Sequence, residues 1–198
     1  MILNPENYTE LYTELNFLKE RMAIKGQIKL HSVKSEVFNG SVKNDSTIYL
    51  TDSLISSYYN DPLPFRYLLG HELVHINYGD FGKRIRSIAS KTLYSNVKRA
   101  ESLLIETRAD MLSYKHNDFS FVEVKGVLTT LKKNEKGKEK SRTYKQGYPS
   151  RSLLIEVMSK FDDFSPEFID YILEDFCTFQ KVSKTTRKKI SDLKEKFI

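Results

Sequence analysis

Two histidines and a glutamate at a fixed spacing are the residues best suited to do chemistry in this sequence. They lie in His71-Glu72-Leu73-Val74-His75, within a stretch whose apolar residues have helical spacing. Residues four apart on an α-helix lie about 40° apart around the axis, so His71 and His75 can offer two imidazole nitrogens to one metal ion. Glu72 flanks that face and is placed to take a proton from water rather than to bind the metal. The spacing predicts a catalytic metal site.

Zinc is the ion that these side chains favour. Neutral imidazoles combined with one carboxylate suit Zn²⁺, and a catalytic zinc site has three protein ligands and one open position. We therefore expect one zinc ion and a third ligand from elsewhere in the chain. In the helical stretch that follows Val97, Glu106 and Asp110 are four residues apart and share a face, whereas Glu101 lies about 140° from Glu106. Only the first pair can address one site together.

Local start and stop signals predict the helices that hold this site. Asp61-Pro62 gives the motif helix an N-cap followed by a first-turn proline, and Gly79 is placed to end it. Residues 81–99 form a basic amphipathic stretch that we interpret as either a helix or a lid over the site. The same kinds of signal predict further helices, over residues 5–25, 52–58, 97–112, 120–133, 150–161, 165–176 and 183–197.

Two short strands precede the motif helix. Residues 27–33 alternate polar and apolar side chains, which is typical of a strand with one buried face, and residues 46–50 follow turn signals and are predicted to form a second short strand. His31 then points away from the apolar face of the first strand, and we expect it to be structural or exposed rather than a metal ligand. Asn39-Gly40 and Asn44-Asp45 are typical of turns.

The composition indicates one soluble domain. A length of 198 residues fits a single domain over residues 1–198, with enough chain to bury a substantial core. Cys177 is the only cysteine, which excludes a disulfide framework and a CxxC zinc ribbon and permits a reducing compartment. The start of the chain lacks a signal-peptide pattern, and no segment approaches about 18 consecutive apolar residues. We therefore expect a cytoplasmic protein without membrane insertion.

Positive charge is concentrated in two blocks. The formal net charge is +6, and residues 132–145 and residues 181–196 each hold seven Lys or Arg against two acidic residues. Outside these blocks the chain is mildly acidic. We interpret the blocks as a solvated loop and a solvated terminal helix, with contact to nucleic acid or to an acidic partner as the alternative.

The motif and the acidic pair together resemble a known family. His71-Glu72-Leu73-Val74-His75 followed by Glu106-Thr107-Arg108-Ala109-Asp110 is similar to the HExxH…ExxAD pattern of gluzincin zinc peptidases of the CAAX prenyl protease and HtpX type. The resemblance covers about residues 45–115. It implies that His71, His75 and Glu106 bind zinc, that Glu72 is the general base and acid, and that Asp110 orients a ligand histidine.

The resemblance also implies a fold and a substrate class. The fold is α+β and zincin-like, mostly helical, with a small sheet whose edge strand precedes the active-site helix. We expect residues 47–50 to be that edge, against which an extended protein or peptide substrate could pair. Peptide hydrolysis is consistent with the residues themselves, since Glu72 can accept a proton from the attacking water and pass it to the leaving amine.

The C-terminal part departs from the family. Those peptidases usually have transmembrane helices or are exported, and they tend to have His-Pro followed by an arginine near the C-terminus. The comparable place here is Tyr148-Pro149-Ser150-Arg151. Tyr148 and Arg151 are therefore candidates to donate to the oxyanion of the reaction. The alternative is a helix N-terminus packed by a tyrosine.

Two other families and one non-catalytic class remain as alternatives. ImmA/IrrE-type regulatory proteases, which cut or destabilise a repressor, combine HExxH with a downstream glutamate, although Asp110 stands where that group tends to have Asn. SprT-like proteases, which work on DNA, would use the basic blocks but imply a third ligand histidine and a cysteine-rich ribbon. His116 could serve as that ligand only if Glu106 did not. The last alternative is a nucleic-acid-associated or metal-stabilised binding protein.

Overall fold

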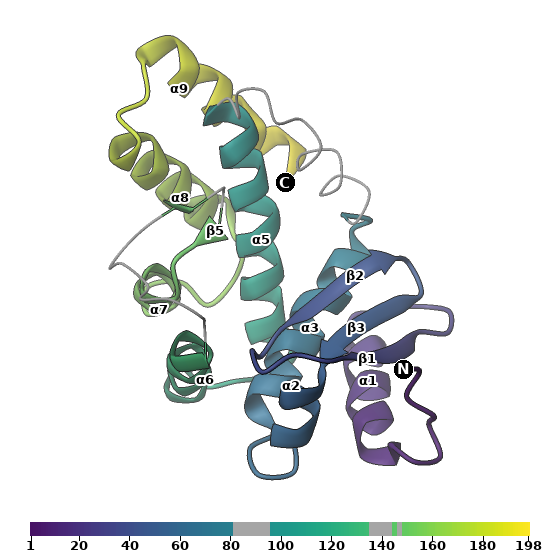
Figure 1. The fold of residues 1–198 in the computed structure, drawn as a ribbon. Helices are drawn as coiled ribbons and strands as arrows, with labels where there is room; N and C mark the ends of the chain where they lie inside the picture. The colour runs from purple at the N-terminus through teal and green to yellow at the C-terminus, as the bar shows by residue number, and fades with distance from the viewer. Residues whose placement is uncertain (81–95, 135–143, 146–147) are drawn as a thin grey trace.

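The computed structural model describes four ranges of the chain, residues 1–80, 96–134, 144–145 and 148–198 (Figure 1). The stretches between them, residues 81–95, 135–143 and 146–147, lie outside the described residues. Most of the basic block 132–145 and most of the amphipathic stretch 81–99, predicted as a helix or a lid, lie in these stretches.

The described residues form a mostly helical α+β fold. They contain eight α-helices, one 3-10 helix, a three-stranded sheet and a two-stranded ladder. The predicted α+β class and the predominance of helix are thereby confirmed. None of the described helices is both long enough and apolar enough to cross a membrane.

The three-stranded sheet has its last strand in the middle. It consists of β1 (Lys29–Val33), β2 (Gly40–Asn44) and β3 (Thr47–Thr51), in the order β1-β3-β2. β3 pairs in parallel with β1 and antiparallel with β2. Leu30 and Ile48 are fully buried on the face that meets the helices, while His31 lies on the other face with its ring 5.0 Å from that of Tyr49. The predicted orientation of His31 is confirmed.

The prediction that residues 47–50 form the sheet edge is wrong. β3 is flanked on both sides, because residues 40–44 form a strand that the sequence patterns did not predict. Asn44-Asp45 is a turn as expected, but Gly40 begins β2 instead of ending a turn. The outer side of β1 is joined by the N-terminal residues through a bridge between Ile2 and His31. Within the described residues, no strand pairs with the outer side of β2.

Residues 1–80 also contribute three helices. α1 (Thr9–Arg21) begins later than predicted, because the Asn4 side chain accepts a hydrogen bond from the Glu6 amide and holds a turn there. α2 (Asp52–Ser57) connects β3 to the motif helix α3 (Leu63–Asn77), which ends before Gly79 as predicted.

The long helix α5 (Asn96–His116) lies beside α3 and links the two halves of the molecule (Figure 1). The two helices approach closely at Gly70, where an added Cβ would lie 2.5 Å from Ser113 Oγ. Ser113 donates a hydrogen bond to the Tyr67 carbonyl across the interface at 2.7 Å. The close approach fixes the distance between the side chains that the two helices present to each other.

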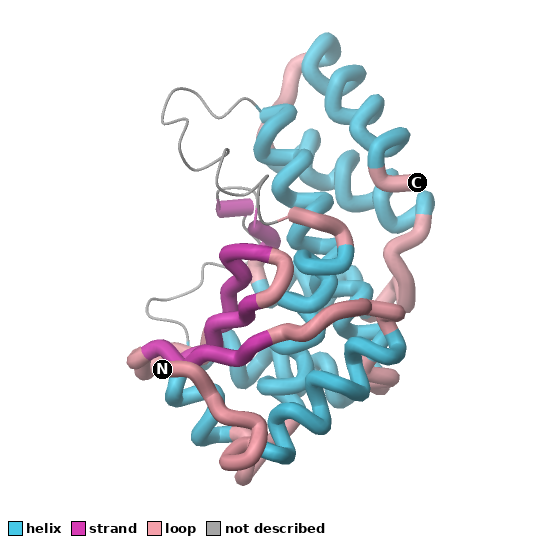
Figure 2. Tube along the Cα trace, turned by 90° about the vertical axis from the view of Figure 1, so that its right-hand side faces the viewer, coloured by secondary structure: helices cyan, strands magenta, loops and turns pink. Residues whose placement is uncertain are grey.

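The remaining helices follow α5 in the C-terminal half, and Figure 2 shows the strands grouped to one side of the helices. The predicted capping box is confirmed, since Ser120 and Glu123 exchange hydrogen bonds at the start of α6. Ser150 and Ser165 cap the two helices predicted to start there. The elements are α6 (Phe121–Asn134), β4 (Tyr144–Lys145), β5 (Tyr148–Pro149), α7 (Arg151–Met158), α8 (Pro166–Phe179), α9 (Lys184–Ser191) and the 3-10 helix η1 (Asp192–Lys196).

Candidate metal centre

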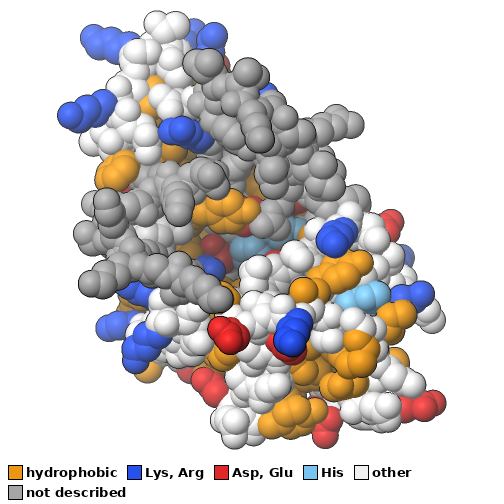
Figure 3. All heavy atoms as spheres, in the orientation of Figure 1, with side chains coloured by type: hydrophobic (Ala, Val, Ile, Leu, Met, Phe, Trp, Pro, Cys, Tyr) orange, Lys and Arg blue, Asp and Glu red, His pale blue; other side chains and the backbone are white. Residues whose placement is uncertain are grey.

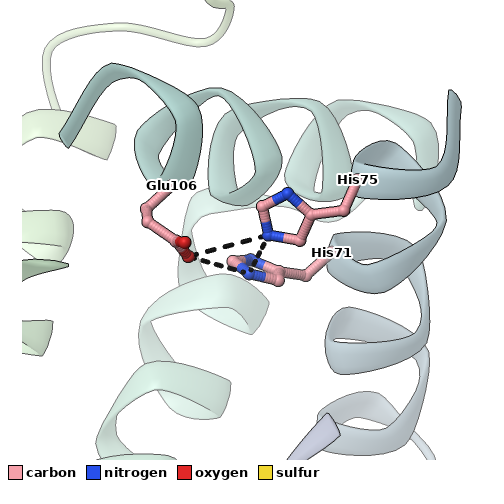
Figure 4. A group of neighbouring side chains, drawn as sticks. All are labelled: His71, His75 and Glu106. Atoms are coloured by element: carbon pink, nitrogen blue, oxygen red, sulfur yellow. Dashed lines mark hydrogen bonds and ion pairs between the residues drawn. The ribbon is translucent and has the colours of Figure 1, made fainter. Parts of the chain in front are cut away.

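Three buried side chains from two helices converge on one point. His71 and His75 project from α3, and Glu106 projects from α5 toward them (Figure 4). One potential ligand atom from each residue lies within 4.8 Å of the others. This group could hold a metal ion, as the pairing of the motif with a downstream glutamate predicts.

The distances within this group are close to those between the ligands of a tetrahedral metal ion. The Nε2 atoms of His71 and His75 are 3.1 Å apart. Oε2 of Glu106 lies 3.4 Å from Nε2 of His71 and 3.6 Å from Nε2 of His75. Two ligand atoms bound about 2.0–2.2 Å from a tetrahedral zinc ion are about 3.3–3.6 Å apart. The two distances to Glu106 match this separation and the distance between the imidazoles is slightly shorter, so the three atoms could hold a metal ion.

Acidic neighbours make the space between the imidazoles favourable for positive charge. Burial alone would lower the pKa of His71, but Asp110 and Glu106 outweigh burial and raise that pKa to about 10. Burial also opposes protonation of His75, and hydrogen bonds with Asp80 and Glu106 nevertheless leave its pKa raised. The same electrostatic environment favours a bound cation.

Asp110 contacts the outer nitrogen of His71. Oδ1 of Asp110 lies 2.8 Å from His71 Nδ1 and accepts a hydrogen bond from the Tyr67 hydroxyl at 2.9 Å. With Nδ1 protonated, His71 donates to this carboxylate and presents a bare Nε2 to the metal position. The predicted proximity of Asp110 to a motif histidine is present, and Tyr67 is a further participant that the sequence reasoning missed.

Asp80 occupies the corresponding place beside His75 and was also missed. Its Oδ2 lies 3.4 Å from His75 Nδ1, and its carboxylate accepts hydrogen bonds from buried Arg108 at 2.7 and 2.9 Å. Burial would raise the pKa of Asp80, but His75 and Arg108 lower it, so the carboxylate is ionised. The position of Gly79 as a helix stop was the available signal, because it places the next residue near the last turn.

Glu72 follows His71 on α3 and is close enough to that histidine to raise its pKa. Its side chain is buried, and Oε2 has no hydrogen-bond partner within the described part of the chain. Strand β2 passes directly over it, since a Cβ added to Gly40 would lie 2.9 Å from Glu72 Cγ. A carboxylate with an unused oxygen is suited to accept a proton from water.

Arg151 and Tyr148, the two candidates to donate to the oxyanion, lie in different surroundings. Arg151 is at the start of α7 with Nη1 4.0 Å from Asp110 Oδ1, so its guanidinium reaches the edge of the metal centre. Tyr148 is 40% exposed in β5, which packs against α5. Their donation to an oxyanion stays a prediction.

The other histidines stand apart from the ligand group. His31 lies on the outer face of the sheet, and His116 is the last residue of α5. Within residues 1–80, 96–134 and 148–198, the single group with metal-binding geometry is His71, His75 and Glu106. Figure 3 shows histidine and acidic side chains in a hollow between the sheet-bearing half and the C-terminal helices. No protein-family model, curated protein or solved structure matches this chain.

Proposed function

We propose that this chain is a zinc-dependent metalloendopeptidase that hydrolyses peptide bonds in the cytoplasm. The observation that carries the proposal is that two imidazole nitrogens and a Glu106 oxygen lie 3.1–3.6 Å from one another, next to a buried glutamate with an unused oxygen. A site with three protein ligands leaves one position open, which is the arrangement of catalytic rather than structural zinc.

Each side chain has a distinct part in this proposal. His71, His75 and Glu106 would hold the ion, which when bound supplies a Lewis acid for a water and a carbonyl. Glu72 accepts a proton from the attacking water and returns it to the leaving amine. Arg151 lies near enough to the centre to stabilise negative charge that develops on the substrate.

We propose that an extended substrate pairs with the edge strand β2. Its outer side is not paired by any described strand, and Gly40 brings its first residue against Glu72. Main-chain hydrogen bonds to an exposed strand hold a peptide in an extended form. The substrate backbone would then pass the general base directly.

Metal content tests the first part of the proposal. Purified wild-type protein should hold about one equivalent of zinc, and His71→Ala, His75→Ala and Glu106→Ala should lose it or bind it much more weakly. Glu72→Gln should retain zinc because its side chain is not a ligand. Stoichiometric zinc in all three ligand variants would refute the assignment.

Proteolysis tests the second part. Glu72→Gln keeps the shape of the side chain but cannot take a proton, so activity should fall by about 10²- to 10⁴-fold. Wild type and Glu72→Gln are expressed in the native host background, and new peptide termini are compared by mass spectrometry. This comparison also serves a regulatory protease of the ImmA/IrrE type, which would cut few proteins. Identical termini from two zinc-loaded proteins would indicate a metal-stabilised binding protein.

A further inference from the structure

We propose that Asp80 is a positioning residue for His75, held in place by Arg108. The proposal rests on the metal-binding part of the proposed function and does not depend on peptide hydrolysis. It gives each motif histidine its own carboxylate, Asp110 for His71 and Asp80 for His75.

The end of α3 brings Asp80 back to His75. Gly79 has a φ of 62°, and its amide donates to the Ile76 carbonyl at 3.1 Å, while the Asp80 amide donates to the His75 carbonyl at 2.9 Å. These two bonds form the Schellman motif, which commonly places an apolar side chain at the Asp80 position against one at the His75 position. Here the contact is between a carboxylate and an imidazole.

Arg108 fixes the carboxylate from the neighbouring helix. Nη2 of Arg108 lies 2.7 Å from Oδ2 and 2.9 Å from Oδ1 of Asp80, and both side chains are buried. The guanidinium is itself held between aromatic rings, 3.9 Å from the centre of Tyr78 and 5.1 Å from that of Phe197. These contacts hold the Asp80 carboxylate in one position relative to Arg108.

The arrangement determines which nitrogen of His75 is available. An ionised carboxylate facing Nδ1 favours the proton on that atom and leaves Nε2 as a lone pair directed at the metal position. The contact is longer than the one between His71 and Asp110, at 3.4 against 2.8 Å. We therefore expect Asp80 to contribute less to zinc affinity than Asp110.

Removing both members of the ion pair separates positioning from stability. Asp80→Ala alone leaves Arg108 buried without this carboxylate and is expected to destabilise the fold. Asp80→Ala/Arg108→Met removes both charges and should restore thermal stability. The matched control is Glu174→Ala/Arg187→Met, which removes an exposed ion pair between α8 and α9.

Zinc affinity is measured by competition with a chromophoric chelator, and the visible absorption of the Co²⁺-substituted protein reports ligand geometry. We expect the double variant to bind zinc about tenfold more weakly than wild type with an altered Co²⁺ spectrum, and the control pair to match wild type. Wild-type zinc affinity and an unchanged spectrum in the folded double variant would overturn the inference while leaving the metal site intact. Failure of wild type to bind zinc would overturn both.

Discussion

Each of the two motif histidines contacts a carboxylate, and the two carboxylates come from different parts of the chain. His71 faces Asp110, four residues after Glu106 on α5, whereas His75 faces Asp80 at the end of its own helix. The spacing within HExxH and between Glu106 and Asp110 predicted the first contact, because residues four apart share a helix face. The second contact depends on a left-handed turn and on Arg108, so periodicity could not indicate it.

Zinc affinity should rise with pH because the metal must displace a proton. The pKa of His71 is raised to about 10 in the metal-free protein, so its charged form contributes stability that is full below pH 6.5 and is lost as pH rises through about 10. Each proton released on binding makes zinc affinity rise about tenfold per pH unit below that pKa. Chelator competition between pH 6.5 and 8.5 measures the slope. An affinity independent of pH would contradict the raised pKa.

Asp110→Ala should weaken zinc binding by about ten- to a hundredfold while leaving the fold in place. The reason is the loss of the acceptor at His71 Nδ1, which also leaves the Tyr67 hydroxyl without its partner at 2.9 Å. Isothermal titration with zinc measures the affinity, and circular dichroism checks the fold. Tyr67→Phe is the companion variant, and a smaller loss is expected because it keeps the carboxylate. Unchanged affinity in Asp110→Ala would make Asp110 a structural acid.

At the scale of elements, the helices were predicted better than the sheet. Capping residues and apolar spacing are local signals, and they identified α3, α6, α7 and α8. β2 offers one buried apolar residue, Val42, between residues that favour turns, and it exists because β3 pairs with it. Its omission made β3 look like an edge, so the error in one strand changed the expected place of the substrate.

Gly40→Ala should impair catalysis without removing zinc. The added Cβ would lie 2.9 Å from Glu72 Cγ, so either β2 or the general base must move. A displacement of about 1 Å in a catalytic group can cost about 10²-fold in rate. Peptide cleavage and zinc content are measured together.

Gly126→Ala is the control, because nothing lies within 4 Å of its added Cβ. This variant should leave activity unchanged and raise the free energy of unfolding by about 0.5–1 kcal/mol. Full activity in Gly40→Ala would show that β2 does not constrain Glu72.

At the scale of the whole molecule, the second basic block is partly tied to the fold. Arg187 pairs with Glu174, Lys194 with Asp170, and Lys196 with Glu101 on α5. These ion pairs use charge that a nucleic-acid surface would present outward, and they favour the interpretation of a solvated terminal helix. The last of these pairs connects the C-terminal segment to α5, the helix that supplies Glu106.

Phe197 connects this C-terminal segment indirectly to His75, because its ring lies over Arg108, which binds Asp80. Phe197→Leu keeps an apolar side chain but removes the cation–π contact, and it should lower the free energy of unfolding by about 0.5–2 kcal/mol. Because Tyr78 still covers Arg108, zinc affinity should fall less than in the Asp80 variant. Phe17→Leu is the control, since the Phe17 ring lies 5.5 Å from the Arg21 guanidinium and 5.7 Å from that of Arg66, and both arginines pair with acidic residues away from the ligand group. Equal destabilisation in the two variants, with zinc affinity reduced only in Phe197→Leu, is the expected outcome. If zinc affinity is unchanged in both, the C-terminal segment stabilises the fold without influencing His75.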